Sequence, residues 1–270
     1  MKILSLSAVL YRRRISILHI NLFMKSRLQK VSILCFWLLI WELFTRLVNN
    51  SFILVGPLET VRHMAILMGR ASFTGILYFS SVRILSSYLL AFLLGLVFAF
   101  FAYRYPFFES LMEAPLFLLR SLPVASFVII LLFFLGRGSL SFFISFWMSF
   151  PVFYFNFLEG LKTLNQTTLE MAKLFRFSLW NRFRYIFIPG IYPQILSSAK
   201  LAMGLSWKSG IAAELIGQVR QSIGYQLMDA KVSLEMGDVF AWSIIMIVLS
   251  KFFEWLVLFL LKKIFSKGSV

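Results

Sequence analysis

The sequence has almost none of the residues from which metal centres, disulfides and most active sites are built. Cys35 is the only cysteine, and His19 and His63 are the only histidines in 270 residues. One cysteine cannot form an internal disulfide, and with two distant histidines it makes a poor zinc ligand set. The GxSxG, HExxH and P-loop patterns are also absent, so hydrolases and nucleotide-binding enzymes lack their residues here. We therefore expect no metal, no cofactor and no catalytic residue.

Charge is scarce as well. Only 14% of the residues are charged, whereas 60% are hydrophobic and the mean hydropathy is +0.85. A soluble domain of this size needs more charge to cover its surface, so the composition predicts an integral membrane protein. The 27 basic residues exceed the 11 acidic ones, which gives a formal net charge of +16. Because the basic residues cluster at the ends of apolar segments, they indicate membrane topology rather than a nucleic-acid surface.

The N-terminus lacks the long apolar core and the small-residue cleavage site of a signal peptide. We therefore expect a retained, basic, cytoplasmic segment over residues 1–30. A single membrane domain is expected over residues 31–264, and a cytoplasmic tail over 265–270. No internal repeat or low-complexity tract divides the chain.

The apolar runs predict an all-α membrane protein with six spans, each near the 20 or so residues that cross a bilayer. The third run is interrupted by Arg120 and Pro123, and the second extends back through Ile76. The expected spans are Val31–Val48, Leu85–Tyr103, Ala114–Leu135, Ser139–Leu158, Ile191–Ile216 and Val239–Leu261.

Lys and Arg in the connecting segments predict the orientation. The N-terminus, the connection between the fourth and fifth spans and the C-terminal tail are rich in basic residues, so we place them in the cytoplasm. The segments on the opposite side contain only Arg62, Arg70, Arg137, Arg220 and Lys231.

A polar, basic segment, Leu161–Pro189, lies between the fourth and fifth spans; we call it the coupling loop. Each half has apolar residues at helical spacing, which predicts two short amphipathic helices on the inner membrane face. Helices of this kind dock a soluble partner or lie on anionic lipid. Its basic residues are Lys162, Lys173, Arg176, Arg182 and Arg184.

The coupling loop resembles the E-A-A…G…I-x-L-P pattern of binding-protein-dependent ABC importer permeases of the MetI-like type. The residues that carry this pattern are Glu170, Met171, Ala172, Ser178, Ile188 and Pro189. Pro189–Gly217 is similar to the fifth helix of sulfonate, taurine and nitrate permeases, and Leu119–Pro123 matches a turn of the same family. The resemblance covers roughly residues 38–258 and favours a docking role for the loop.

This resemblance implies a transmembrane permease subunit of an importer in the bacterial inner membrane. The family works as a homodimer with two cytoplasmic ATPase subunits, which hydrolyse ATP in its place, and an extracytoplasmic substrate-binding protein. The coupling helices sit in a groove of the ATPase and transmit its closure to the spans. The implied substrate is a small anion of the sulfonate, taurine or nitrate type, with thiamine or pyrimidine precursors as the alternative.

Rival functions fit the residues less well. The coupling subunit of a vitamin importer also docks ATPases, but it carries Ala-Arg-type motifs instead of the pattern found here. A membrane-embedded enzyme needs convergent His, Asp or Cys residues, which this chain lacks. A channel leaves the coupling loop unexplained.

The sequence departs from the family pattern at three positions. Arg176 stands where the family has glycine, so either the turn differs or Arg176 adopts a strained positive φ. Met171 is bulkier than the usual alanine. Leu205 replaces a frequent arginine, and a lysine stands at Lys208 instead.

The fifth span is the predicted wall of the translocation pathway. Lys200, Gly204 and Lys208 share a helix face, and small residues along the span allow close helix packing. An ionisable residue at membrane depth suggests function. Lys208 either attracts an anionic substrate or forms a bridge with Glu214, Glu42 or another helix.

Other residues have narrower predicted roles. Trp207 is assigned to the pathway because it adjoins Lys208, and Glu214 is expected mainly to pair with a basic residue. Ser178 is predicted to cap the second coupling helix, and Pro189 to begin the fifth span. The expected structural contacts are an ion pair between Lys251 and Glu254 and bracing of a broken helix by Arg120.

Overall fold

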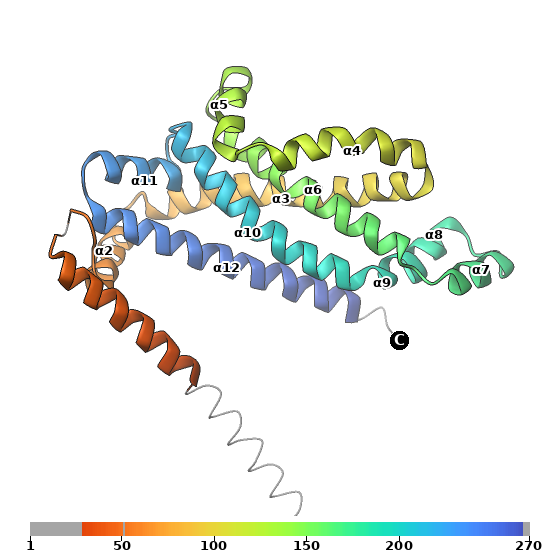
Figure 1. Ribbon diagram of the computed structural model, residues 1–270, viewed down its shortest axis with the longest axis horizontal. Coiled ribbons are helices and arrows are strands. Elements are labelled where there is room, and N and C mark those ends of the chain that lie inside the picture. The colour runs from red at the N-terminus through yellow and green to blue at the C-terminus, as the bar shows by residue number, and fades with distance from the viewer. Residues whose placement is uncertain (1–28, 51, 267–270) are drawn as a thin grey trace, which may run out of the picture. The chain divides into compact units, whose positions relative to one another are not determined.

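The computed structural model describes residues 29–50 and 52–266, and this part of the chain folds into helices without strands (Figure 1). The described residues form two compact units, one that ends at Arg62 and one that begins at His63. Within the first unit, the helix Gln29–Val48 carries an ion pair between Arg46 Nε and Glu42 Oε1 at 2.9 Å. The indole Nε1 of Trp41 donates to the carbonyl of Val55 at 3.0 Å. Most of the expected N-terminal segment 1–30 and of the expected tail 265–270, namely residues 1–28 and 267–270, lies outside the described residues.

The second unit contains most of the helices. α2, Pro57–Met68, runs across the boundary between the two units. The others are α3 Phe73–Arg104, α4 Pro106–Ser121, α5 Val124–Leu135, α6 Leu140–Lys162, α7 Gln166–Leu174, α8 Leu179–Arg182, a π-helical turn Phe183–Phe187, α9 Ile188–Gly190, α10 Tyr192–Ile216, α11 Ile223–Val232 and α12 Met236–Ser266.

Four described helices are long and apolar enough to cross a membrane, and the bent pair α4–α5 brings the number to five. They are Gln29–Val48, Phe73–Arg104, Leu140–Lys162 and Met236–Phe265. The apolar runs therefore located the first, second, fourth and sixth expected spans as helices. α10 occupies the fifth position as a helix of 25 residues. It is not among the apolar candidates, because small and polar side chains dilute its hydropathy.

The third expected span, Ala114–Leu135, is broken, as the interruption at Arg120 and Pro123 predicts. Its residues belong to two helices, α4 and α5, which are bent by 108° at a short break. The break falls at Leu122, whose backbone is extended (φ −72°, ψ 131°) immediately before Pro123. A residue before proline is pushed out of the helical region, and proline cannot donate to the preceding turn. α4 also begins earlier than expected, at Pro106 in its first turn.

Three helices, α3, α6 and α10, pack closely in the second unit. Gly210 of α10 marks their crossing, because a Cβ there would lie 2.4 Å from Ser145 Oγ and 2.8 Å from Ile84 Cγ1. The hydroxyl of Ser145 donates to the carbonyl of Ser206 at 2.9 Å, and the hydroxyl of Tyr88 donates to that of Ala199 at 3.0 Å. Small residues bring backbones together, and buried hydroxyls join the helices. α10 is thus held on two sides.

Candidate functional site

The coupling loop forms two short helices at one end of the long helices, with α11 at the other end (Figure 1). α7 begins after Asn165, whose side chain accepts a hydrogen bond from the backbone N–H of Thr167 at 2.9 Å. α8 begins after Ser178, whose hydroxyl accepts from the backbone N–H of Asn181 at 3.2 Å. These side chains satisfy amides that have no partner inside a helix. The predicted cap at Ser178 is confirmed.

Arg176 ends α7 in the left-handed region, with φ +50°. Its backbone N–H donates to the carbonyl of Lys173 at 3.0 Å, and the N–H of Phe177 donates to that of Ala172 at 2.9 Å. This pair of bonds is a Schellman motif, which usually has glycine at the left-handed position. Arg176 therefore adopts the strained left-handed conformation within a Schellman turn, the second of the two alternatives that the sequence left open.

The coupling loop is attached to the bundle by aromatic rings and by a close backbone approach. The buried ring of Phe187 lies edge-on to Phe100 of α3, with 5.3 Å between centroids, and 6.0 Å from the ring of Tyr103. Gly190 lies directly against the side chain of Leu164 at the start of the loop. The two ends of the loop are thus packed together, and the loop also packs on α3. A displacement of α7 or α8 would therefore be transmitted to α3 and α10.

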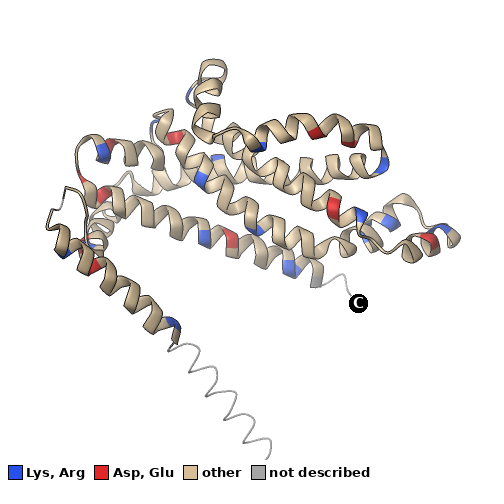
Figure 2. Cartoon of the chain, viewed as in Figure 1, with Lys and Arg blue, Asp and Glu red and all other residues tan. Residues whose placement is uncertain are grey.

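The outer surface of the loop carries charges and large apolar side chains together. Glu170 is exposed, and no described residue pairs with its carboxylate. Ala172, by contrast, is buried. Figure 2 shows the charged residues gathered around α7 and α8. The exposed apolar side chains are Met171, Leu174, Phe175, Leu179, Trp180 and Tyr185. Large apolar side chains exposed together in one short segment are typical of an interaction site.

The start of the fifth helix differs from the prediction. Pro189 lies in α9, a single turn before α10, and not in the first turn of the long helix. α10 begins at Tyr192, and Pro193 occupies its first turn. Two prolines near this start made the boundary ambiguous from sequence, since either is tolerated there. Ile188 is half-buried in α9, and Pro189 is exposed.

Lys200, Gly204 and Lys208 lie on one exposed face of α10, as their spacing predicts. The exposed side chains of Leu201 and Leu205 extend this face. Lys208 forms no ion pair with any carboxylate in the described part of the chain. Lys200 and Lys208 therefore lie on a face of α10 that no other described helix of this single chain covers.

Trp207 and Glu214, the other residues assigned to the pathway, are buried on the packed side of α10. The ring of Trp207 stacks on Phe253 of α12, with 5.7 Å between centroids and 16° between planes. The structure thus separates Trp207 from its neighbour Lys208, because adjacent residues of a helix point about 100° apart. Sequence adjacency did not place them on one face.

Glu214 bonds to polar groups rather than to a basic side chain. Its Oε2 accepts from the hydroxyl of Ser80 at 2.8 Å and from the backbone N–H of Gly224 at 3.3 Å. No Lys or Arg of the described chain comes within ion-pair distance of it, so the expected basic partner is absent from this arrangement. Ser80 was missed because nothing in an isolated serine of an apolar run signals a partner 134 residues away.

Two further expectations concern structural contacts. Lys251 Nζ lies 2.8 Å from Glu254 Oε1, which confirms the predicted ion pair on α12. Arg120, at the end of α4, lies over the ring of Phe155 at 4.9 Å from its centroid. This cation–π contact joins the broken helix to α6 and supports the bracing role expected of Arg120.

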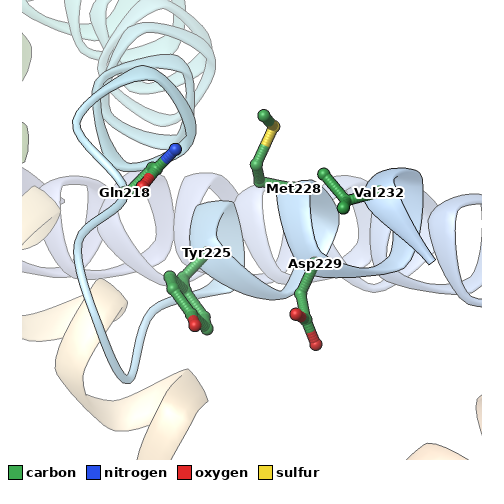
Figure 3. A pocket seen from close by; sticks show the side chains of 5 residues that line it. All are labelled: Gln218, Tyr225, Met228, Asp229 and Val232. Carbon is green, nitrogen blue, oxygen red and sulfur yellow. The ribbon is translucent and has the colours of Figure 1, made fainter.

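A small hollow lies beside α11, and none of the predicted site residues lines it (Figure 3). Gln218 comes from the turn after α10, and Tyr225, Met228, Asp229 and Val232 come from α11. Its volume is about 160 Å³. Pockets for drug-sized molecules measure roughly 300–1,000 Å³, so this hollow is too small to enclose an organic solute of that size.

Known proteins match this chain over most of its length. The family described as "Binding-protein-dependent transport system inner membrane component" matches residues 91–266. A Bacillus subtilis protein named "Putative aliphatic sulfonates transport permease protein SsuC" is 27% identical over 215 residues, which are 78% of this chain and 77% of the relative. The "Bicarbonate transport system permease protein CmpB" of Synechocystis sp. is 35% identical over 75 residues, 28% of this chain and 27% of the relative.

Proposed function

This chain belongs to the binding-protein-dependent transport system inner membrane component family, the permease subunits of ABC importers, and from that premise we propose how it works. We propose that the coupling loop docks a cytoplasmic ABC ATPase through α7 and α8. The observation that carries the proposal is their exposed surface, where an unpaired Glu170 lies among large apolar side chains. Rigid-body closure of the ATPase would then move α3 and α10 through the contacts of Phe187 and Gly190.

The proposed membrane arrangement has six spans, with α4–α5 as a broken third span and α10 as the fifth. We place the coupling loop and the C-terminal end of α12 in the cytoplasm, because basic residues concentrate at that end of the bundle. The ring of Tyr192, at the start of α10, lies 4.7 Å from that of Phe265, which supports a common side for both. α11 is then on the extracytoplasmic side, where the substrate-binding protein approaches.

The translocation pathway is proposed to form between two copies of the chain. The face of α10 with Lys200, Gly204 and Lys208 is open in the single chain and basic, whereas a lipid-facing helix seldom carries two unpaired lysines. A second copy facing it would enclose a cationic passage. Trp207 and Glu214 support this wall from behind by fixing α10 against α12 and α3.

A cationic passage suits a small anion, and the names of the relatives point to sulfonate or bicarbonate. We propose an aliphatic sulfonate or a comparable small oxyanion as the substrate. The test is ATP-dependent uptake of radiolabelled taurine, nitrate and bicarbonate by cells with and without this chain. Uptake of one of these anions that requires the chain is expected. Chain-dependent uptake of thiamine or a pyrimidine, with none of the three anions, would refute the anion assignment.

A further inference from the structure

A buried polar cluster joins three helices at the end of the bundle opposite the coupling loop. It consists of Glu214 of α10, Ser80 of α3 and the first backbone amides of α11, those of Ile223 and Gly224. All four residues are buried. We call this group the Glu214 cluster. A buried carboxylate is expensive to maintain, and the function proposed above uses it only to fix α10 against α3.

The hydrogen bonds of the cluster converge on the beginning of α11. Ser80 Oγ donates to Glu214 Oε2 at 2.8 Å and accepts from the N–H of Ile223 at 3.0 Å. The N–H of Gly224 donates to the same carboxylate oxygen at 3.3 Å. The first amides of a helix have no partner within it, and a negative charge is favourable there. α3 and α10 therefore supply the groups that hold α11 in place.

The packing at Gly224 makes this contact sensitive to position. A Cβ at residue 224 would lie 2.4 Å from Glu214 Cβ and 2.5 Å from the backbone nitrogen of Leu215. The backbones of α11 and α10 thus touch directly, without a flexible side chain between them. The hydrogen bonds form only while α11 is seated against α10.

The cluster also has unused hydrogen-bonding groups. Glu214 Oε1 and Arg83 Nη1 are both buried without a hydrogen-bond partner among the described residues. Arg83 follows Ser80 by three residues on α3, and residues three apart lie on the same face of a helix, so Arg83 is on the face from which Ser80 reaches Glu214. Unpaired buried groups are costly. Arg83 is therefore an alternative partner for the Glu214 carboxylate.

We propose that Glu214 is a positioning residue that latches α11 over the extracytoplasmic end of the pathway and releases it by exchanging Ser80 and Gly224 for Arg83. Seated α11 is the latched state. When α10 and α3 move during transport, the carboxylate transfers to the guanidinium and α11 swings away as a lid. This proposal rests on the proposed function, because it assigns the cluster a step in the transport cycle.

The latch is tested by the reactivity of a cysteine on the packed side of α11. Ala230 is buried there, and Ala202 is buried in α10 away from the cluster. Each is changed to Cys in a Cys35→Ser background, and the purified protein is labelled with a maleimide. Glu214→Ala removes the buried hydrogen bond from Gly224 of α11 and the one from Ser80, whose hydroxyl also binds the N–H of Ile223. Labelling of the Ala230→Cys variant should therefore quicken about tenfold or more. Labelling of the Ala202→Cys variant should not change.

Glu214→Gln separates positioning from simple support. Glutamine keeps an acceptor for Ser80 and Gly224 but has no charge with which to form an ion pair with Arg83, so the latch should hold without releasing. In the complete transporter with its ATPase and binding protein, ATP should quicken labelling of the Ala230→Cys variant. Glu214→Gln and Arg83→Gln should each abolish that increase and slow transport.

Three results would overturn the latch. They are unchanged labelling of the Ala230→Cys variant in the Glu214→Ala protein, parallel labelling of the Ala202→Cys variant, and a persisting ATP response in Glu214→Gln. Parallel labelling would mean that Glu214 only stabilises the fold. The Glu214→Ala comparison needs no ATPase, so its outcome stays distinct from a failure of the proposed function, which would appear as no ATPase binding.

Discussion

Arg176 combines a backbone cost with an exposed positive charge on the coupling loop. Its φ of +50° costs a residue with a Cβ about 1–2 kcal/mol, which glycine avoids. The guanidinium is exposed and lies in the turn between α7 and α8. Strain at a functional site persists only where the surrounding structure enforces it, and here the Schellman bonds do so. We infer that the charge is retained for contact with the ATPase.

Replacing Arg176 separates these two effects. Arg176→Gly should raise the free energy of unfolding by about 1 kcal/mol, because it removes the strain, whereas Arg176→Ala should leave it nearly unchanged. Both variants should bind the ATPase more weakly, since both lose the guanidinium. Thermal unfolding in detergent and a binding titration measure the two quantities. Equal stability of the two variants would show that the left-handed turn carries no strain.

Glu170 tests the docking surface at a single side chain. Glu170→Lys should weaken ATPase binding by about tenfold or more, since a reversed charge at an interface costs roughly 1.4 kcal/mol or more. Glu235→Lys is the matched control, because Glu235 is also exposed but lies in the turn before α12, at the opposite end. Co-purification of the ATPase measures the effect. Equal recovery with both variants would remove Glu170 from the docking surface.

Lys208 tests the pathway. Lys208→Ala should lower anion uptake by about tenfold, the equivalent of roughly 1.4 kcal/mol of lost attraction, without affecting assembly. Lys208→Arg keeps the charge and should retain most of the uptake. If Lys208→Ala transports normally, the lysine has a structural role, with a partner supplied by a second copy of the chain.

Residue-level predictions succeeded where the partner is close in sequence. The Ser178 cap and the Lys251–Glu254 pair each join residues three apart, so helical spacing alone specifies them. Glu214 bonds to Ser80 across 134 residues, and that contact depends on how α3 meets α10. Sequence spacing contains no information about such a crossing.

At the scale of the helices, hydropathy located most elements but not the bend in the third. The mean hydropathy of Ala114–Leu135 is that of an apolar span. A mean hydropathy does not reveal whether the helix changes direction within the span. Pro123 was recognised as an interruption, yet the 108° bend also requires an extended Leu122 and a helix that begins at Pro106. For α10 the hydropathy is too low although the helix is present. Its small and polar residues allow close helix packing, and they lower the mean hydropathy of the segment.

Gly210 and Gly204 offer a matched pair on α10. Gly210→Ala should destabilise the protein by about 1–3 kcal/mol, because the added Cβ meets Ser145 and Ile84. Gly204→Ala should be neutral or stabilising by up to about 1 kcal/mol, since nothing lies within 4 Å of its Cβ and alanine favours the helix. Thermal unfolding in detergent compares them. Similar stability of the two variants would contradict the close crossing of α3, α6 and α10.

At the scale of the whole molecule, the proposed ATPase-docking surface lies at one end of the long helices and the proposed α11 latch at the other (Figure 1). α10 connects the two ends and carries the lysine face between them. The sequence predicted the membrane class and the family, because these depend on composition and on local motifs, and the docking role of the coupling loop stays a prediction. It did not predict the latch, which depends on tertiary contacts.

The most direct test of the account is a pull-down from the chain's own cells. The detergent-solubilised wild type is compared with a variant in which residues 170–187 are scrambled, and both are first shown to be folded and monodisperse. The account predicts that the wild type recovers one specific ABC ATPase and that the scrambled variant recovers none. Recovery of no ATPase by the folded wild type, or equal recovery by the scrambled variant, would contradict coupling through α7 and α8.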